Sequence, residues 1–192
     1  MLTDAILNSL VPPGAPLSLV GATGESFPSG LIDLLGLGAG VAPKSAVPGV
    51  TGGVIIGNVA TFGQPGGMAV GKRPELNVTV GTGLVTSDSC TLNAALQAAP
   101  DSGAGGGYQP GTWQTIGETG PLTAAQCPAG TVIMRFPWLP PFPAGLRPRF
   151  LRLLFQTPSG EQFTAGSIAS AVVTTTRDDQ FNRNAANNYV VG

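Results

Sequence analysis

The sequence predicts an all-β domain, and three observations predict it. Short runs of alternating apolar and polar residues recur through the second half of the chain, which is typical of half-buried strands. Clusters of turn-forming residues separate these runs. The composition combines 42% hydrophobic residues with only 10% charged residues, 29 glycines and 18 prolines, which fits a β-domain with long, weakly charged loops and arms. A sandwich, a barrel or a jelly roll would each satisfy these observations.

The strongest signal covers residues 149–176, RFLRLLFQTPSGEQFTAGSIASAVVTTT. Period-two geometry gives its first half an apolar face, formed by Leu151, Leu153 and Phe155. The opposite face is mixed and carries Phe150, Arg152, Leu154 and Gln156. Residues 158–160, Pro-Ser-Gly, are turn-forming, because proline presets φ and glycine tolerates positive φ. We therefore expect a long β-hairpin at the centre of the domain.

The N-terminal third is less regular. Residues 1–10 are expected to form a short amphipathic turn, and short strands are predicted over 17–20 and 30–35. Residues 36–71 are rich in glycine, alanine, valine and proline, with Lys44 their only charge. A structureless loop of this length is uncommon inside a compact domain. We interpret it as an apolar, extended arm that lies on another subunit, and the alternative is a flexible insertion.

From residue 74 the strand pattern becomes regular. Strands are predicted over 76–80, 90–97, 112–118, 122–126 and 131–136, and the last has Val132, Met134 and Phe136 on one face. Residues 137–148 are proline-rich and cannot join a ladder, so an exposed or interface loop is expected. The predicted organisation is an N-terminal arm at 1–29, a β-domain at 30–179 that contains the 36–71 insertion, and a C-terminal tail at 180–192.

Catalytic and cofactor chemistry is not expected. The chain has no histidine, which excludes Ser-His-Asp and Cys-His devices. The two cysteines, Cys90 and Cys127, lack the spacing of a zinc site and are expected to be buried free thiols. Residues 66–73, GGMAVGKR, imitate a phosphate-binding loop, but Arg73 stands where serine or threonine should be and Pro74 follows where a helix should begin. Asp178 and Asp179 are adjacent, so on a strand they would point to opposite faces, unlike a glycosidase pair.

Charge argues for protein partners. The net charge is −1, and the bases are thinly spread, with no cluster beyond Arg147, Arg149 and Arg152. Nucleic-acid binding needs several clustered bases, so it is not expected. The most apolar window, residues 31–42, is too short to span a bilayer, so no membrane association is expected. A surface so poor in charge suits burial against protein.

The two tryptophans leave a choice open. Trp113 and Trp138 could each stack on a sugar or a base. Trp138, between prolines in FPWLPPFP, is more typical of a packing or interface anchor.

The order of features resembles the Bbp16-like capsid cement proteins of tailed bacteriophages. The matching pieces are Ile32-Asp33-Leu34, LNVTV at 76–80, SCTLNAALQAAPD at 89–101, PLTAAQCPAGTVIMRFP at 121–137 and RFLRLLFQTPSGEQFTAGSIASAVV at 149–173. No single motif carries the resemblance; their order and spacing do. The segment 36–71 is longer than the family pattern.

The resemblance implies a jelly roll that forms a homotrimer on the outside of an icosahedral head, where it contacts major capsid protein subunits. It implies a virion protein made in the host cytoplasm, with no enzymatic activity and no cofactor. The candidate contacts lie on segments that can reach across subunit junctions. These are the N-terminal arm with Leu2, Ile6 and Leu7, the segment 36–71, and the 137–148 loop with Trp138 and Phe142. The alternative is a carbohydrate-binding jelly-roll module of a phage virion that uses a tryptophan. A third class, an enzyme using carboxylates alone, has no paired site in the sequence.

Overall fold

The computed structural model describes residues 9–12, 14–21, 24–33, 55–56, 59–60, 74–104, 108–136, 142–146, 148–158 and 160–175. These residues form two large antiparallel sheets and two small two-stranded ones. Apart from strands, the elements within them are limited to short 3₁₀ turns such as Ala124–Gln126. The predicted all-β class is confirmed.

The first large sheet has five strands. In the order in which they pair, these are β1 (Ser9–Val11), β15 (Ser167–Thr175), β7 (Pro74–Val80) and β12 (Val132–Phe136), and β2 (Leu17–Ser18) also pairs with β15. The long contact between β15 and β7 runs from Ile168 opposite Val80 to Thr175 opposite Pro74. Pro74 is the first residue of its strand, a position at which a missing N–H is tolerated.

The second large sheet has six strands. In pairing order these are β10 (Gln114–Glu118), β9 (Thr91–Ala99), β13 (Phe150–Gln156) and β3 (Ser26–Pro28). Two short strands extend it: β4 (Ile32–Asp33) pairs with β13, and β11 (Leu122–Thr123) pairs with β9. The small sheets are β8 (Val85–Thr86) with β14 (Phe163–Ala165) and β5 (Ile55–Ile56) with β6 (Val59–Ala60).

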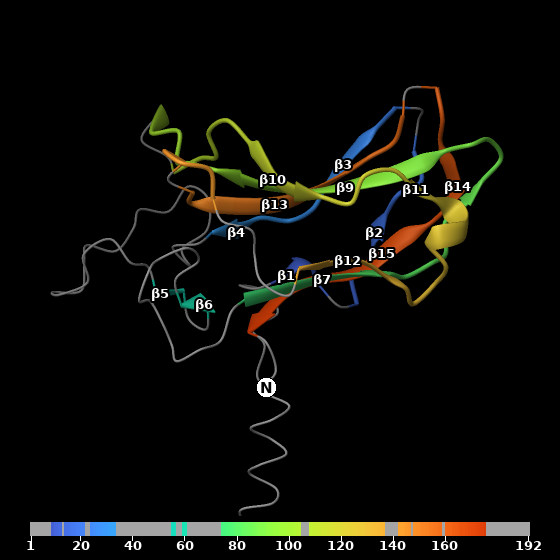
Figure 1. Ribbon diagram of the computed structural model, residues 1–192, viewed down its shortest axis with the longest axis horizontal. Coiled ribbons are helices and arrows are strands. Elements are labelled where there is room, and N and C mark those ends of the chain that lie inside the picture. The colour runs from blue at the N-terminus through green and yellow to red at the C-terminus, as the bar shows by residue number, and fades with distance from the viewer. Residues whose placement is uncertain are drawn as a thin grey trace, which may run out of the picture.

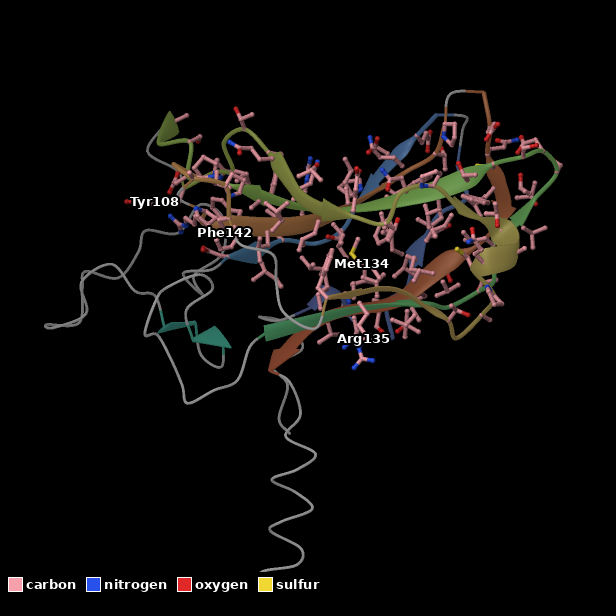
Figure 2. The ribbon with its side chains drawn as sticks, viewed as in Figure 1. Tyr108, Met134, Arg135 and Phe142 are labelled. Atoms are coloured by element: carbon pink, nitrogen blue, oxygen red, sulfur yellow. The ribbon has the colours of Figure 1, made fainter. Side chains whose placement is uncertain are left out.

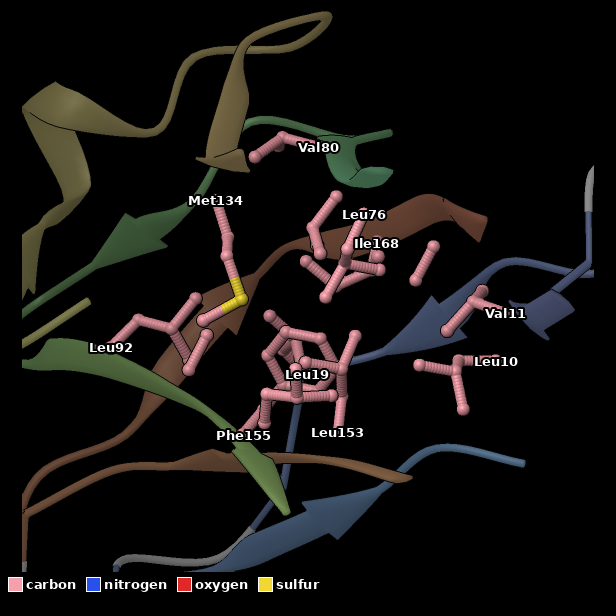
Figure 3. Packing of buried hydrophobic residues seen from close by; sticks show 14 of the residues in the cluster. Leu10, Val11, Leu19, Leu76, Val80, Leu92, Met134, Leu153, Phe155 and Ile168 are labelled. Carbon is pink, nitrogen blue, oxygen red and sulfur yellow. The ribbon is translucent and has the colours of Figure 1, made fainter. Parts of the chain in front are cut away.

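The two large sheets lie face to face as two layers (Figure 1). Each strand that crosses the middle turns alternate side chains inward, and these fill the space between the layers (Figure 3). The second sheet contributes buried residues such as Leu92, Leu96, Leu151, Leu153 and Phe155. The first sheet faces them with Leu10, Leu76, Val78, Met134 and Ile168. The apolar face predicted for residues 151–155 is therefore confirmed.

The predicted hairpin over residues 149–176 is wrong. Its two halves are strands, but β13 pairs with β9 and β3 in one sheet while β15 pairs with β7 and β1 in the other. Between them the chain forms β14, and then Gly166 redirects it with a φ of 152° into the opposite layer. Two apolar runs separated by a turn fit a connection between layers as well as a hairpin, so the local pattern could not distinguish the two arrangements.

The predicted arm over residues 1–29 also needs correction. Strands β1, β2 and β3, between Ser9 and Pro28, belong to the two large sheets. Leu10 and Val11 are buried in the core, so residues 9–11 are a structural strand rather than the end of an amphipathic turn. Residues 1–8, most of 36–71, and the tail from 176 onward lie outside the described residues.

In strand β12, one of the three residues predicted to share a face does not lie on it. Met134 is buried as predicted, but Val132 is 47% exposed. The register shifts between Val132 and Met134, and such a bulge places one residue out of alternation. Figure 2 shows Met134 pointing into the space between the layers and Arg135 pointing away from it.

Candidate functional site

Most of the predicted contact residues lie outside the described part of the chain. This holds for Leu2, Ile6, Leu7 and Trp138. Phe142 is described: it is half-buried and packs against the hydrophobic core. Figure 2 places Phe142 and Tyr108 toward the same end of the molecule's long axis. That end also holds the most highly charged buried cluster among the described residues.

The cluster is centred on Arg149, whose side chain is 5% exposed. Its Nε donates to Asp33 Oδ1 at 3.2 Å and its Nη2 donates to Asp33 Oδ2 at 3.0 Å, which is the two-bond geometry that suits a guanidinium and a carboxylate. Its Nη1 donates to Asp101 Oδ2 at 2.7 Å. The ring of Tyr108 lies 4.6 Å from the guanidinium carbon. All three nitrogens of this guanidinium therefore bind carboxylates.

Strand pairing brings these residues together from distant parts of the sequence. Asp33 is the last residue of β4 and lies opposite Phe150, the first residue of β13. Arg149 N donates to Ala99 O at 2.8 Å, which holds the start of β13 against the end of β9 and so near Asp101. The cluster therefore joins three places where the chain leaves or enters the second sheet. We call it the Arg149 clamp, meaning Arg149, Asp33, Asp101 and Tyr108.

The electrostatics of the clamp fit a permanent ion pair. Burial by itself disfavours the charged guanidinium, but the hydrogen bonds and negative charges of Asp33 and Asp101 outweigh it and raise the pKa of Arg149. A buried cation with such partners stays charged at every physiological pH. The charged guanidinium therefore holds the strand ends together through its two carboxylate partners.

Sequence reasoning missed the clamp. Asp33 is predicted only as part of a short strand over 30–35, and Arg149 only as one of three thinly clustered bases at the start of an apolar run. The available signal was a charged residue at the end of each of several apolar runs. Buried charges are almost always paired, so such residues are candidates for one another's partners.

A second cluster lies on the outward face of the second sheet. Arg152 Nε donates to Gln97 Oε1 at 2.9 Å, and Gln97 Nε2 donates to Thr115 Oγ1 at 3.3 Å. The Arg152 guanidinium carbon lies 4.2 Å from the centroid of the half-buried Trp113 ring. The arginine thus covers one face of the ring that was considered for sugar stacking, leaving only the other face for a ligand.

The two thiols are both buried and free, as expected. Burial raises the pKa of Cys90 to about 11, and the negative charges of Asp88 and Glu161 add to the effect. Burial also raises the pKa of Cys127. A thiol with a raised pKa is a weak nucleophile at neutral pH, because the thiolate is the reactive form.

Residues 66–73 and Asp178 with Asp179 lie outside the described residues. Among the residues that the structure describes, no three His, Cys, Asp or Glu side chains are grouped so that they could hold a metal ion. The same residues contain no helix that is long and apolar enough to cross a membrane.

The sequence matches no model of a known protein family, and a search of curated proteins finds no match.

Proposed function

We propose that this chain is a jelly-roll capsid cement protein, which forms a homotrimer on the outside of an icosahedral phage head and stabilises contacts between major capsid protein subunits. The sequence resemblance to Bbp16-like proteins suggests the function. The strand order, the charge distribution and the clamp each support one part of it.

The order of strand pairing supports the jelly roll. Counting β1 with β2, β3 with β4, and β10 with β11 as single positions, the two large sheets contain eight strand positions. The first position pairs with the last (β1 with β15), the second with the seventh (β3 with β13), the third with the sixth (β7 with β12), and the fourth with the fifth (β9 with β10). Such nested pairing results when a long antiparallel ribbon folds over into two sheets, which is the winding of a jelly roll.

The observation that best supports the cement function is that the two long connections begin and end at neighbouring strand ends. The connection between β4 and β7 leaves at Asp33, and the connection between β12 and β13 leaves at Phe136 and returns at Phe150. Asp33 lies opposite Phe150 in one sheet, and Phe136 lies opposite Leu76 near the start of β7 in the other. Two weakly charged connections thus begin or end at adjacent strand ends. The Arg149 clamp holds two of these ends together, the end of β4 and the start of β13, in the second sheet.

This arrangement suits a protein that joins neighbouring capsid subunits, for a physical reason. A rigid sandwich that buries its own core can remain folded while segments at one end bind neighbours. A protein that binds the assembled lattice but not free subunits stabilises the lattice by mass action. Binding costs translational and rotational freedom, so the connections need apolar anchors that offset that loss.

Heat resistance of the shell tests the proposal. Shells that lack the protein should release DNA at a lower temperature than complete shells, and adding purified protein back should restore the difference. Equal heat resistance of the two kinds of shell would contradict the cement function.

A truncation of residues 1–8 tests the predicted N-terminal contacts; it should weaken attachment while leaving the sandwich folded. The cut must stop there, because Leu10 is part of the core.

A further inference from the structure

The outward face of the second sheet carries an arginine whose charge is not neutralised by its neighbours. Among the described residues, Arg152 has its Nε hydrogen bond to Gln97 and its stacking contact with Trp113, and neither Nη group has a hydrogen-bond partner. On the same face, the Glu118 carboxylate accepts a hydrogen bond from Asn93 Nδ2 at 3.1 Å. Arg149 differs in this respect, because its guanidinium binds two carboxylates.

The position of Arg152 is set by its surroundings. Gln97, directly opposite it on β9, holds Nε, and Thr115 on β10 in turn holds the Gln97 amide. Trp113 supports the flat face of the guanidinium. A side chain held from the edge and from one face loses little conformational entropy when a ligand binds. What stays available is the end of the guanidinium that carries the two Nη groups.

The residues beside it are apolar. Leu154, two positions along β13, is half-buried and lies opposite the exposed Pro28 on β3. Burial removes part of the hydration of the Arg152 guanidinium and so lowers the pKa of Arg152. A cation in this state interacts more strongly with an arriving anion than a fully hydrated one does. Tryptophan and arginine are also the residues most enriched at the energetic centres of protein interfaces.

We propose that Arg152, supported by Trp113 and Gln97, is a docking anchor for an aspartate or glutamate side chain on a partner protein. The carboxylate accepts hydrogen bonds from the two Nη groups, and the apolar part of the partner packs over Trp113, Leu154 and Pro28. The proposal adds a contact on a sheet face to those expected from the connecting segments. It rests on the proposed function only for the identity of the partner, the capsid lattice.

A titration that needs no capsid tests the anchor itself. In a Trp138→Phe protein, Trp113 is the only tryptophan and reports on its own surroundings. The probe is the peptide N-acetyl-Gly-Asp-Gly-amide, and its asparagine analogue is the control. The aspartate peptide should change Trp113 fluorescence saturably, with an affinity that falls roughly tenfold or more in Arg152→Gln. Arg135→Gln, which removes an equal charge from the other sheet, should bind the peptide as before.

The proposal would be overturned by no saturable response to the aspartate peptide, by an equal response to the asparagine analogue, or by unchanged affinity in Arg152→Gln. Sulfate that binds as tightly as the peptide would also overturn it, since the site would then be a general anion site. Decoration of shells supplies a separate readout, in which Arg152→Gln should attach roughly tenfold more weakly than Arg135→Gln. If the wild-type protein fails to bind shells, the capsid function fails, and the peptide titration still decides the anchor.

Discussion

Arg149 shows how much of this fold depends on a single buried charge. Replacing it with methionine removes the guanidinium that binds Asp33 through two hydrogen bonds, and breaking a buried ion pair in this way should cost about 3–5 kcal/mol in the free energy of unfolding. Adding Asp33→Asn should recover part of that loss, because the remaining neutral amide is cheaper to bury than a carboxylate. Urea unfolding of the two single variants and the double variant measures the coupling. Simple additivity would show that the two side chains do not act as a pair.

Strand β13 offers a contrast between neighbouring side chains. Leu151 and Leu153 are fully buried, whereas Arg152 between them faces outward and is half-buried. Leu153→Ala should cost roughly 2–5 kcal/mol through lost apolar burial and the cavity it leaves. Arg152→Ala should cost less than about 1 kcal/mol, because it removes one hydrogen bond and one ring contact near solvent. Equal losses in thermal or denaturant unfolding would contradict the observed inward and outward faces.

The buried thiols predict a dependence of stability on alkaline pH. The pKa of Cys90 is raised to about 11 in the folded protein, whereas an ordinary thiol has a pKa of about 8.5. The folded state therefore binds this proton more tightly, and its contribution is present below the ordinary value and lost as the pH rises toward the raised value. The free energy of unfolding should fall over that interval, and less steeply in Cys90→Ala. Parallel pH profiles for the two proteins would exclude this cause.

At the scale of elements, the strands were far easier to predict than their partners. The alternation of Leu92, Ala94 and Leu96 in β9 and of Leu151, Leu153 and Phe155 in β13 identifies both strands, and their burial agrees with it. The same alternation contains no information about which strands pair, because a side chain that points inward looks alike in a hairpin and in two opposed layers. The hairpin prediction failed for this reason. The bulge in β12 is invisible in the sequence for a related reason, since a bulge shifts alternation without changing composition.

The connection between layers depends on Gly166. Its φ of 152° is open to glycine and strained for other residues, and an added Cβ would overlap the side chain of Leu84, which is buried. Gly160 has a φ of 88° but open space around it. Gly160→Ala should cost about 1–2 kcal/mol from backbone strain alone, and Gly166→Ala should cost more because crowding of the core adds about 1–3 kcal/mol. Denaturant unfolding of the pair gives the comparison, and the reverse order would contradict this role of Gly166.

At the scale of the whole molecule, alternating runs, turn clusters and composition together predicted the class of fold, whereas the strand topology could be read only from the structure. The pairing of β1 with β15 joins the beginning of the described chain to its end, and no local pattern in Ser9–Val11 indicates a partner so distant. The Arg149 clamp has the same character, because Asp33 and Arg149 are 116 positions apart in the sequence. The candidate contacts at Leu2, Ile6, Leu7 and Trp138 remain predictions.

The proposed function requires a trimer at a defined place. Electron microscopy of the particle or assembly that contains this chain tests that requirement most directly. We predict three copies around a local threefold axis on the outer surface of the head, with density for each copy that fits the two sheets of the sandwich and contacts the major capsid protein through the end that holds the Arg149 clamp. Particles in which the protein is absent from the head, lies inside the shell, or is present as isolated single copies would contradict the account.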